Sequence, residues 1–593
     1  MLCLFRSLCI SEKDRCSLSK DSTVCFPCQR EKSFQRKKED AMKRLGGRIA
    51  LCALLLTVAL VGSSLAASDT QTVKVGLAYS SGALASANLE NSVGNGYQFG
   101  YYDGAGTFIS LGSTDTTQIS MLKTQNLYLA KDGTYTTVSS GSAGTIGCYH
   151  LQLPGTYSSF SAAQSKAATV TGGFPAWISG TYYVRTGAYA TEAAAKTAQS
   201  SLGINGTAIV GTTSSGISVT QTKTTKILFQ YDNAGGAVFS VKPGTSGETS
   251  TKTWFKGNKY AGSFLYELIG GGNLTVVNYV TMDDYLKGII PYEMSSSWPA
   301  EALKAQAVCA RSYVLSSTGS KHASNHFDLC NTTCCQAYRG CGRATNFTDA
   351  QVDATSGICA WYNGKIAQTF YYASNGGATE DCANVWFADL PYLKGKPDPY
   401  EADIASTVSG YYWTKTYTAS ELTTLLKNKG VSCGTIVDLS VTQFTPSGNV
   451  REITFTDNAG KTYVYSKEKV RTILGLKSFH FTISGGAGGN TGTRYYVDGN
   501  STLSNLNGVW AIGKGSSKEQ MSGSGQTVIT SSGTETLTGN TQGTAVPAGS
   551  FVISGAGNGH NVGMSQWGAY AMAKRGYTYD QILKFYYSGI DLY

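Results

Sequence analysis

Short runs in which apolar and polar residues alternate recur along the chain from about residue 72. The segments "TVKVGLAYSS" and "NGYQFGYYDG" have this pattern and are flanked by Gly and Ser, which predicts strands joined by turns. Residues 252–281 continue the pattern and predict a meander of strands. We therefore expect a β-rich chain with an N-terminal region at 68–170 and a larger region at 250–593.

Helical spacing appears in fewer places. Ile289 and Ile290 read as the end of a buried strand that breaks at Pro291, and a helix is expected from Pro299 onwards. Two more helices are expected near the C-terminus, over 565–574 and from Tyr579. The apolar stripe of the helix after Pro299 consists of Leu303, Ala307, Ala310 and Val314.

A strand, a helix and a second strand are predicted between residues 182 and 210. The first strand covers 182–186, and Thr191 can cap the helix that follows it. The helix is expected to end near Gly203, before a strand at 207–210. With the strands elsewhere, this pattern gives an α+β fold class with a few helices and an inserted small βαβ unit.

The N-terminus reads as an export signal. Residues 42–67 have a basic start, an apolar run and small residues at the end, which is the pattern of a secretory signal peptide. A single membrane anchor is the alternative, although the run is short for a span of about 20 residues. We interpret residues 1–41 as the result of a start codon assigned too early, so that they are not part of the working protein.

Removing this leader changes the charge. The whole chain has a formal net charge of +10, but residues 1–67 hold 12 Lys and Arg against 6 Asp and Glu. The remainder is therefore close to neutral, at +4, which gives no reason to expect a nucleic-acid partner. Further along, Gly, Ser and Thr dominate residues 483–545, which we read as an insertion: either a linker or an exposed hairpin.

Nine cysteines remain outside the leader, and four of them fall within residues 330–341. His326 precedes them, so the segment offers ligand types suited to tetrahedral Zn²⁺. Disulfides are the alternative, because an exported chain meets oxidising conditions. Nine cysteines cannot all pair within one chain.

Glu293 lies between Pro291 and the predicted helix, whose residues Lys304 and Arg311 are seven apart and so share one flank. A carboxylic acid can protonate a glycosidic oxygen, and burial beside aromatic residues would raise its pKa. The nearby cations would bind an anionic sugar. The alternative is a structural salt bridge between Glu293 and one of these cations.

Two long motifs carry a family resemblance. "DDYLKGIIPYEMSSSWPAEALKAQAVCARSYVL" and "GHNVGMSQWGAYAMAKRGYTYDQILKFYYSG" closely resemble the two signatures of the SpoIID/LytB family, and the likeness covers about residues 255–593. The resemblance implies a lytic transglycosylase that cleaves peptide-free peptidoglycan strands between MurNAc and GlcNAc and leaves 1,6-anhydro ends. It places the catalytic carboxyl on Glu293 and the important cations on Lys304 and Arg311.

The same resemblance suggests further site residues. Two departures from the usual signature are Asn561, where Gly is common, and Trp567, where Tyr is common; both are expected to keep a polar, aromatic loop. A structural zinc is implied at His326, Cys330 and Cys335, with Cys334 or Cys341 as substitutes. Candidate substrate-binding residues, for which turn, cap or core roles are the alternative, are Tyr372, Ser374, Asn375, His560, Gln566 and Trp567.

The segment "TYYVRTGAYATEAAAKTAQ" resembles the start of a SPOR domain, with Arg185 where Gln is usual, and we place a SPOR-like glycan-binding unit at 175–230. An unrelated α+β unit is the alternative. The resemblance thus leaves two functions open: a transglycosylase, or a non-catalytic amidase enhancer of the LytB type. Either would be exported and bind peptidoglycan, with a cell-wall amidase and membrane-anchored sporulation proteins as possible partners.

Overall fold

The first predicted strand pairs with the last strand before the candidate site. The computed structural model describes residues 71–91, 96–211, 215–234, 236–244, 252–317, 321–386, 388–485 and 549–593, and the backbone of six short strands between 495 and 536. In it, β1 (Thr72–Ala78) runs antiparallel to β19 (Thr275–Thr281) and parallel to β20 (Leu329–Cys330). The sheet continues through β18 (Ser263–Glu267), β15 (Phe239–Pro243), β3 (Tyr97–Tyr102) and β4 (Phe108–Thr114).

A second, ten-stranded sheet packs against the first. Phe99 of β3 stacks on Phe229 of β14, with ring centroids 5.3 Å apart, and both are fully buried. Apolar faces of both sheets therefore share one core. The sheet order is β12 (Ala208–Val210), β9 (Tyr149–Gln152), β11 (Thr181–Tyr189), β10 (Gly173–Ile178), β14 (Ile227–Asp232), β13 (Ile217–Gln221), β5 (Gln118–Lys123), β2 (Ser86–Asn91), β16 (Thr253–Phe255) and β17 (Asn258–Tyr260).

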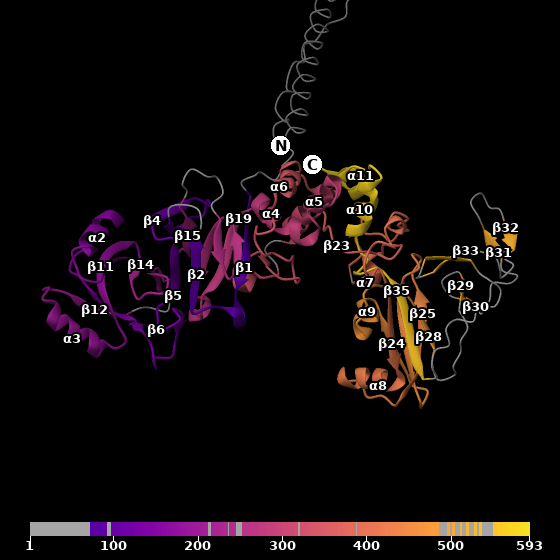
Figure 1. The fold of residues 1–593 in the computed structure, drawn as a ribbon, viewed down its shortest axis with the longest axis horizontal. Helices are drawn as coiled ribbons and strands as arrows, with labels where there is room; N and C mark the ends of the chain where they lie inside the picture. Colours follow the sequence, from indigo (N-terminus) through magenta and orange to yellow (C-terminus); the bar gives the residue numbers. More distant parts are fainter. Residues whose placement is uncertain are drawn as a thin grey trace, which may run out of the picture. The chain divides into compact units, whose positions relative to one another are not determined.

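This pairing differs from the predicted division of the chain. Strands from residues 72–123 and strands from residues 217–281 belong to the same two sheets (Figure 1). The region predicted at 68–170 is therefore not a separate module before the region predicted at 250–593. Local alternation identified the strands correctly but carries no information on which distant strand each one meets.

The predicted strand–helix–strand segment is confirmed as local structure and belongs to a larger unit. Thr191 caps α3 (Glu192–Leu202) by accepting a hydrogen bond from the Ala194 N–H, and Gly203 ends it in the left-handed conformation. With β9, α2 (Phe160–Ala167) and β10 before it, the chain runs β-α-β-β-α-β over residues 149–210. Its sheet order, β12-β9-β11-β10, is that of a split βαβ unit. This unit starts earlier than the predicted 175–230.

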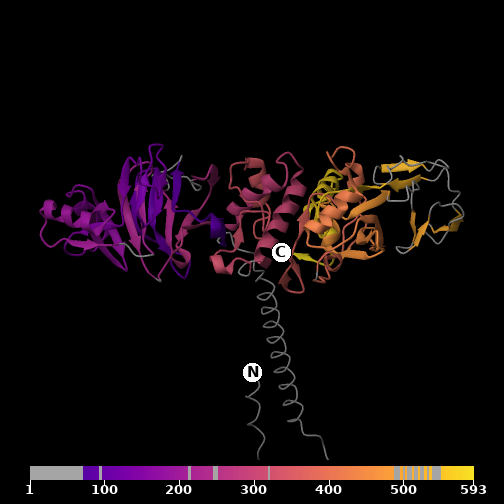
Figure 2. The ribbon, with the colours of Figure 1, turned by 90° about the horizontal axis from the view of Figure 1, so that it is seen from below.

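Helices cover the region that follows β19 (Figures 1 and 2). α5 (Ala300–Ser317) confirms the helix predicted after Pro299, and its whole predicted stripe is buried. α4 (Met282–Glu293) replaces the strand expected at Ile289 and Ile290. Its buried residues recur at helical spacing from Met282, but Pro291 masks that pattern in the sequence, because proline disfavours the interior of a helix. α6 (Asn346–Asp353), α10 (Gln566–Lys574) and α11 (Tyr579–Tyr586) pack with these helices.

The C-terminal part holds two three-stranded sheets. One has the order β24 (Tyr412–Thr418), β35 (Ser550–Ala556) and β28 (His480–Gly485); the other joins β25 (Ile436–Phe444), β26 (Val450–Asp457) and β27 (Thr462–Ser466). Most of the predicted insertion lies outside the described residues. Within it, β33 (Thr527–Thr530) and β34 (Gly533–Thr536) pair as the expected hairpin.

Smaller elements complete the described fold. Helices α7 to α9 are Cys382–Val385, Ala419–Asn428 and Glu468–Leu474. Short strands are β6 (Leu127–Leu129), β7 (Tyr135–Thr136), β8 (Gly144–Ile146), β21 (Ala360–Tyr362), β22 (Lys365–Ile366), β23 (Tyr371–Tyr372), β36 (Met564–Ser565) and β37 (Asp591–Leu592). The remaining pairs in the insertion are β29 (Tyr495–Val497) with β30 (Ser501–Leu503) and β31 (Trp510–Ile512) with β32 (Lys518–Gln520).

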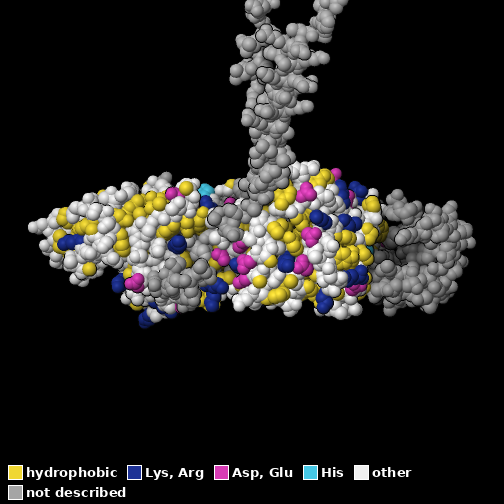
Figure 3. All heavy atoms as spheres, turned by 90° about the horizontal axis from the view of Figure 1, so that it is seen from above, with side chains coloured by type: hydrophobic (Ala, Val, Ile, Leu, Met, Phe, Trp, Pro, Cys, Tyr) yellow, Lys and Arg dark blue, Asp and Glu magenta, His cyan; other side chains and the backbone are white. Residues whose placement is uncertain are grey.

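Two expectations from the sequence concern the N-terminal signal segment and the charge of the surface. The predicted signal peptide at 42–67 and the segment at 1–41 lie outside the described residues. Among the described helices, none combines the length and the apolar character that crossing a bilayer requires. On the face shown in Figure 3, Lys and Arg side chains are interspersed with Asp and Glu, in keeping with the nearly balanced charge of the chain after residue 67.

Candidate active site

Glu293 is the last residue of α4, and its side chain remains partly exposed. Thr281 caps the start of this helix, so β19 and α4 together fix where the helix ends. The Gln566 amide donates a hydrogen bond to the carboxylate, and the Ala337 backbone N–H and the Tyr371 hydroxyl lie close enough to stabilise its charged form. The Gln566 Nε2 to Glu293 Oε2 distance is 3.5 Å, at the long end of the hydrogen-bond range.

These donors come from distant parts of the chain. β23 and β36 are parallel neighbours, and Tyr371 is directly opposite Met564. Ser565 then caps α10 by accepting a hydrogen bond from the Gly568 N–H, which places Gln566 in the first turn of that helix. Gln566 is thereby held between Glu293 and Gln306 of α5.

Burial raises the pKa of Glu293 above its usual value, while the hydrogen bonds from Gln566, Ala337 and Tyr371 oppose this effect. The larger effect of burial favours the protonated form, as a general acid requires. The carboxyl group is thus both reachable and able to donate a proton.

Gln336 connects two tyrosine side chains close to Glu293. Its amide oxygen accepts a hydrogen bond from the Tyr285 hydroxyl at 2.8 Å, and its nitrogen donates to the Tyr371 hydroxyl at 3.2 Å. Tyr371 is therefore oriented to donate onward to Glu293. Sequence reasoning missed Gln336, Ala337 and Tyr371, because no local pattern connects them to Glu293.

The two cations expected at the site have other partners. Arg311 is 0% exposed and forms an ion pair with Asp283 at 3.0 Å. It also donates to the Ile358 carbonyl, so the predicted substrate-binding role is wrong: substrate cannot reach the guanidinium. Lys304 pairs with Glu301 at 2.8 Å but is partly exposed, and its role toward substrate stays a prediction.

The loop after β23 is buried and does not offer the expected ligands. Ser374 is 2% and Asn375 0% exposed, and Tyr372 is 5% exposed. These three predicted substrate-binding residues are therefore corrected to structural ones. Asn375 donates to Asp398, and its backbone N–H donates to Glu401.

Glu401 holds this buried loop in place through hydrogen bonds. Its carboxylate accepts hydrogen bonds from the Asn375 and Gly376 N–H groups, the Tyr411 hydroxyl and the Ser565 hydroxyl. Burial and the nearby Asp398 raise the pKa of Glu401 to about 7. Because Ser565 also caps α10, Glu401 ties the loop to the helix that carries Gln566.

The C-terminal loop carries Asn561 where Gly is common in the signature that this segment resembles. Asn561 has a φ of 60°, which an Asn tolerates better than most residues. It is fully buried, and its amide donates to the Asn375 and Ala378 carbonyls, so it does not contact substrate as expected. His560 packs against Tyr372 and Trp386, with its Nδ1 accepting from the Val562 N–H.

His560 is held neutral by its surroundings. Burial lowers its pKa to about 3, and the Arg471 charge acts in the same direction. A hydrogen bond to the Tyr371 backbone occupies its ring as well. His560 thus holds the backbone of a residue that contacts Glu293, while its predicted contact with sugar hydroxyls has no support. Gln566, by contrast, contacts the carboxylate, and Trp567 directly follows Gln566 in the chain.

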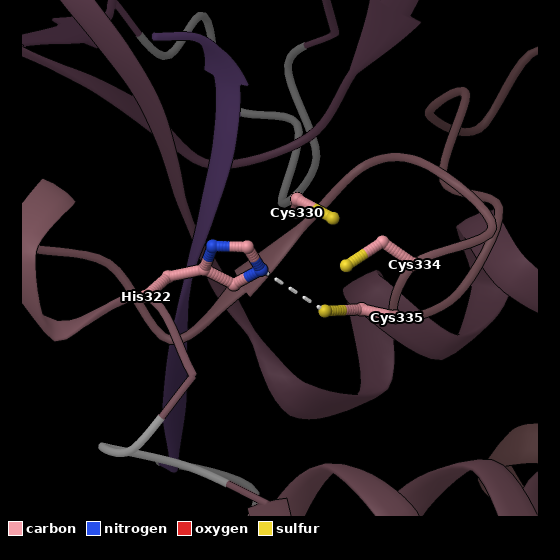
Figure 4. Close-up of side chains that lie close together, drawn as sticks. All are labelled: His322, Cys330, Cys334 and Cys335. Carbon is pink, nitrogen blue, oxygen red and sulfur yellow. Dashed lines mark hydrogen bonds between the residues drawn. The ribbon is translucent and has the colours of Figure 1, made fainter. Parts of the chain in front are cut away.

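Four residues form a candidate metal centre (Figure 4). The ligand atoms of His322, Cys330, Cys334 and Cys335 all lie within 4.8 Å of one another. His326, predicted as the ligand, instead pairs with Glu267 at 2.8 Å, its side chain 55% exposed. The correction arises because residues 323–325 form a turn that points the two histidines in different directions. Cys341 lies elsewhere, against the Lys259 carbonyl.

The donor set suits zinc. Tetrahedral Zn²⁺ with bonds of about 2.3 Å separates its sulfur ligands by roughly 3.8 Å, so a small contraction of the cluster would suffice. Burial raises the pKa of both Cys330 and Cys335, but hydrogen bonds from Thr332 and Cys335 hold the pKa of Cys330 below its usual value. All nine cysteines after the leader are free thiols.

Comparison with known proteins decides the family. The family model SpoIID, stage II sporulation protein, matches residues 270–362, which include Glu293 and the metal cluster. An uncharacterized protein of Brachyspira hyodysenteriae is 30% identical over 355 residues, covering 59% of this chain and 77% of that protein. The chain belongs to the SpoIID/LytB family.

Two characterised relatives carry different names within this family. Stage II sporulation protein D of Bacillus subtilis is 25% identical over 389 residues, covering 62% of this chain and 89% of the relative. The amidase enhancer of Bacillus subtilis is 33% identical over 320 residues, covering 52% of this chain but only 40% of the relative. Membership of the SpoIID/LytB family therefore does not by itself choose between these two names.

Proposed function

We propose that this SpoIID/LytB protein is a lytic transglycosylase that cleaves peptide-free peptidoglycan strands between MurNAc and GlcNAc. The observation that carries the proposal is the partly exposed Glu293 carboxyl, with its raised pKa and three neutral groups that stabilise its charged form. The names of its relatives, amidase enhancer and stage II sporulation protein D, support a role in sporulation or cell-wall remodelling, which we propose takes place outside the cytoplasm. Peptidoglycan strands are its partner, with an amidase that removes the peptides beforehand.

One carboxyl group is enough for this reaction. Protonated Glu293 gives its proton to the glycosidic oxygen, and the bond from that oxygen to the MurNAc anomeric carbon breaks. The Glu293 carboxylate then takes the proton of the MurNAc 6-hydroxyl while the oxygen of that hydroxyl bonds to the anomeric carbon. No water is consumed, so no second carboxylate is needed to activate one. Gln566 and Tyr371 keep the Glu293 oxygens in place through both steps.

A non-catalytic amidase enhancer is the second candidate, favoured by the 33% identity to that relative. Product analysis separates the two. We expect the purified protein to release 1,6-anhydroMurNAc ends from peptide-free glycan, detected by mass spectrometry. Reducing ends would indicate a hydrolase, and an absence of products together with faster amidase turnover would establish the enhancer.

We also propose a structural zinc held by His322, Cys330, Cys334 and Cys335. Three thiolates and one imidazole make a closed set, and zinc bound there stabilises the fold without a catalytic position. Cys335 is followed by Gln336 and Ala337, so the cluster would fix the segment that contacts Glu293.

Metal analysis tests this proposal. We expect about one zinc per chain in protein purified under reducing conditions, and its loss in Cys335→Ser. Chelation should lower the melting temperature of the wild type but not that of the variant. Cys433→Ser, a partly buried cysteine outside the cluster, is the matched control and should keep its metal. A metal-free wild type with a disulfide between cluster cysteines would contradict the proposal.

A SPOR-like role for the unit at 149–210 remains a proposal as well. The β-α-β-β-α-β order and the "TYYVRTGAY" strand support it. Binding of the wall by this unit would suit either candidate function.

A further inference from the structure

Three partly exposed aromatic side chains cluster where α10 packs against the start of α5, in the region that also contains the candidate catalytic carboxyl. The ring centroids of Trp298 and Trp567 are 4.5 Å apart, and that of Tyr570 is 5.1 Å from Trp298 and 5.3 Å from Trp567. Each side chain is neither buried nor fully exposed. We call these three residues the aromatic platform.

Folding alone does not explain the platform. Between Gln566 and Met572 of α10, Trp567 and Tyr570 are the two residues that are not buried, and they lie one turn apart. Trp298 packs partly on the core, whereas Trp567 and Tyr570 are outside the described core clusters. Large aromatic rings that leave the core and gather at one place are typical of binding surfaces.

The chain connects the platform to Glu293 from two sides. Trp567 directly follows Gln566, whose amide contacts Glu293. Trp298 lies five residues after Glu293, in the connection between α4 and α5. The platform is therefore carried by the same segments as Glu293 and its amide donor Gln566.

The chemistry favours a neutral ring. Aromatic faces attract the C–H groups on the flat side of a pyranose, while the hydroxyl groups around the edge remain free to bind water. On α5, the Lys304 ammonium is already paired with Glu301. An acidic peptide would find little charge to pair with here, so the surface suits a saccharide.

We propose that Trp298, Trp567 and Tyr570 form a subsite that holds one pyranose ring of the glycan strand next to the bond that Glu293 cleaves. This inference rests on the proposed transglycosylase function. It adds Trp298 and Tyr570 to the residues that contact substrate, and it assigns binding of the strand to stacking more than to the cations.

Binding is measured in the Glu293→Gln background, so that the strand stays intact. The probe is a peptide-free oligosaccharide of alternating GlcNAc and MurNAc, titrated by calorimetry. We expect Tyr570→Ala and Trp567→Leu each to weaken binding about tenfold, since the loss of an aromatic contact of about 1.4 kcal/mol corresponds to that factor. Tyr570→Phe keeps the ring and should bind within about twofold of the background.

A matched control is available in the same chain. Trp361 is also partly exposed and stacks on Tyr593, with centroids 5.1 Å apart, in the β21–β37 pair. Trp361→Ala should leave affinity unchanged. Melting curves of all variants identify any that fail to fold, and Tyr570→Phe against Tyr570→Ala then carries the comparison.

The outcomes separate this inference from the proposed function. Unchanged affinity in both platform variants, or an equal loss in Trp361→Ala, overturns the platform even if wild type forms anhydro ends. A selective tenfold loss supports the platform. If wild type forms no anhydro ends but the selective loss is present, the subsite stands as a binding site and the catalytic proposal alone fails.

Discussion

Glu293→Gln should lower the rate at which 1,6-anhydro ends form by about 100-fold to 10,000-fold. This is the usual contribution of a general acid–base group. Glutamine has the same shape and can still bond to Gln566, but it cannot transfer a proton. The rate of product formation from peptide-free glycan, measured by mass spectrometry, checks this.

The pH profile gives an independent test. The glycosidic oxygen needs protonated Glu293, so the wild-type rate should fall as the pH rises through the pKa of this group. Burial raises that pKa above its usual value, which shifts the fall to higher pH. Any residual rate in Glu293→Gln should lack this limb.

Asp284→Asn is the matched control for Glu293→Gln. It removes a carboxylate from the first turn of the same helix, about 14 Å away at a rise of about 1.5 Å per residue. We expect its rate to stay within about twofold of the wild type. Equal product from Glu293→Gln and wild type would remove the catalytic assignment.

Arg311→Met should cost about 3–5 kcal/mol of unfolding free energy, the usual effect of breaking a buried ion pair from one side. The change leaves Asp283 without its guanidinium partner and removes the hydrogen bond to the Ile358 carbonyl. Urea unfolding followed by fluorescence measures this loss. The double variant Arg311→Met with Asp283→Leu should recover part of it, because no unpaired charge then remains.

Lys304→Met serves as the comparison. Lys304 and Glu301 are 23% and 28% exposed at the side chain, and such pairs contribute about 0–1 kcal/mol. If Arg311→Met kept its stability and lost glycan binding instead, the substrate role expected from the sequence would be restored.

Local patterns predicted the elements well and their tertiary partners poorly. Thr191, Gly203 and Ser565 act at helix ends as their residue types suggest, because capping depends on neighbours within a few positions. Arg311 shows the limit. Its place at the edge of an apolar stripe suggested contact with solvent, but the segment around Ile358 covers it, and no spacing in α5 reveals that.

The metal residues show the same limit. The spacing from His326 to Cys330 suits zinc as well as any, yet His322 faces the thiols because of the turn between the two histidines. Glu293 could be found because a long motif surrounds it. Its donors could not, since β23 and β36 meet only through the tertiary fold.

The strands on either side of the Gly, Ser and Thr-rich insertion have a consequence for how this protein can change. β28 and β35 are adjacent and antiparallel, and Gly485 lies opposite Phe551. The chain thus leaves and re-enters at neighbouring points, as it would at a tight turn, and added length carries only a slowly growing entropic penalty. A folded domain should therefore be tolerated at this junction. A reporter domain inserted there would lengthen the polypeptide without displacing either strand.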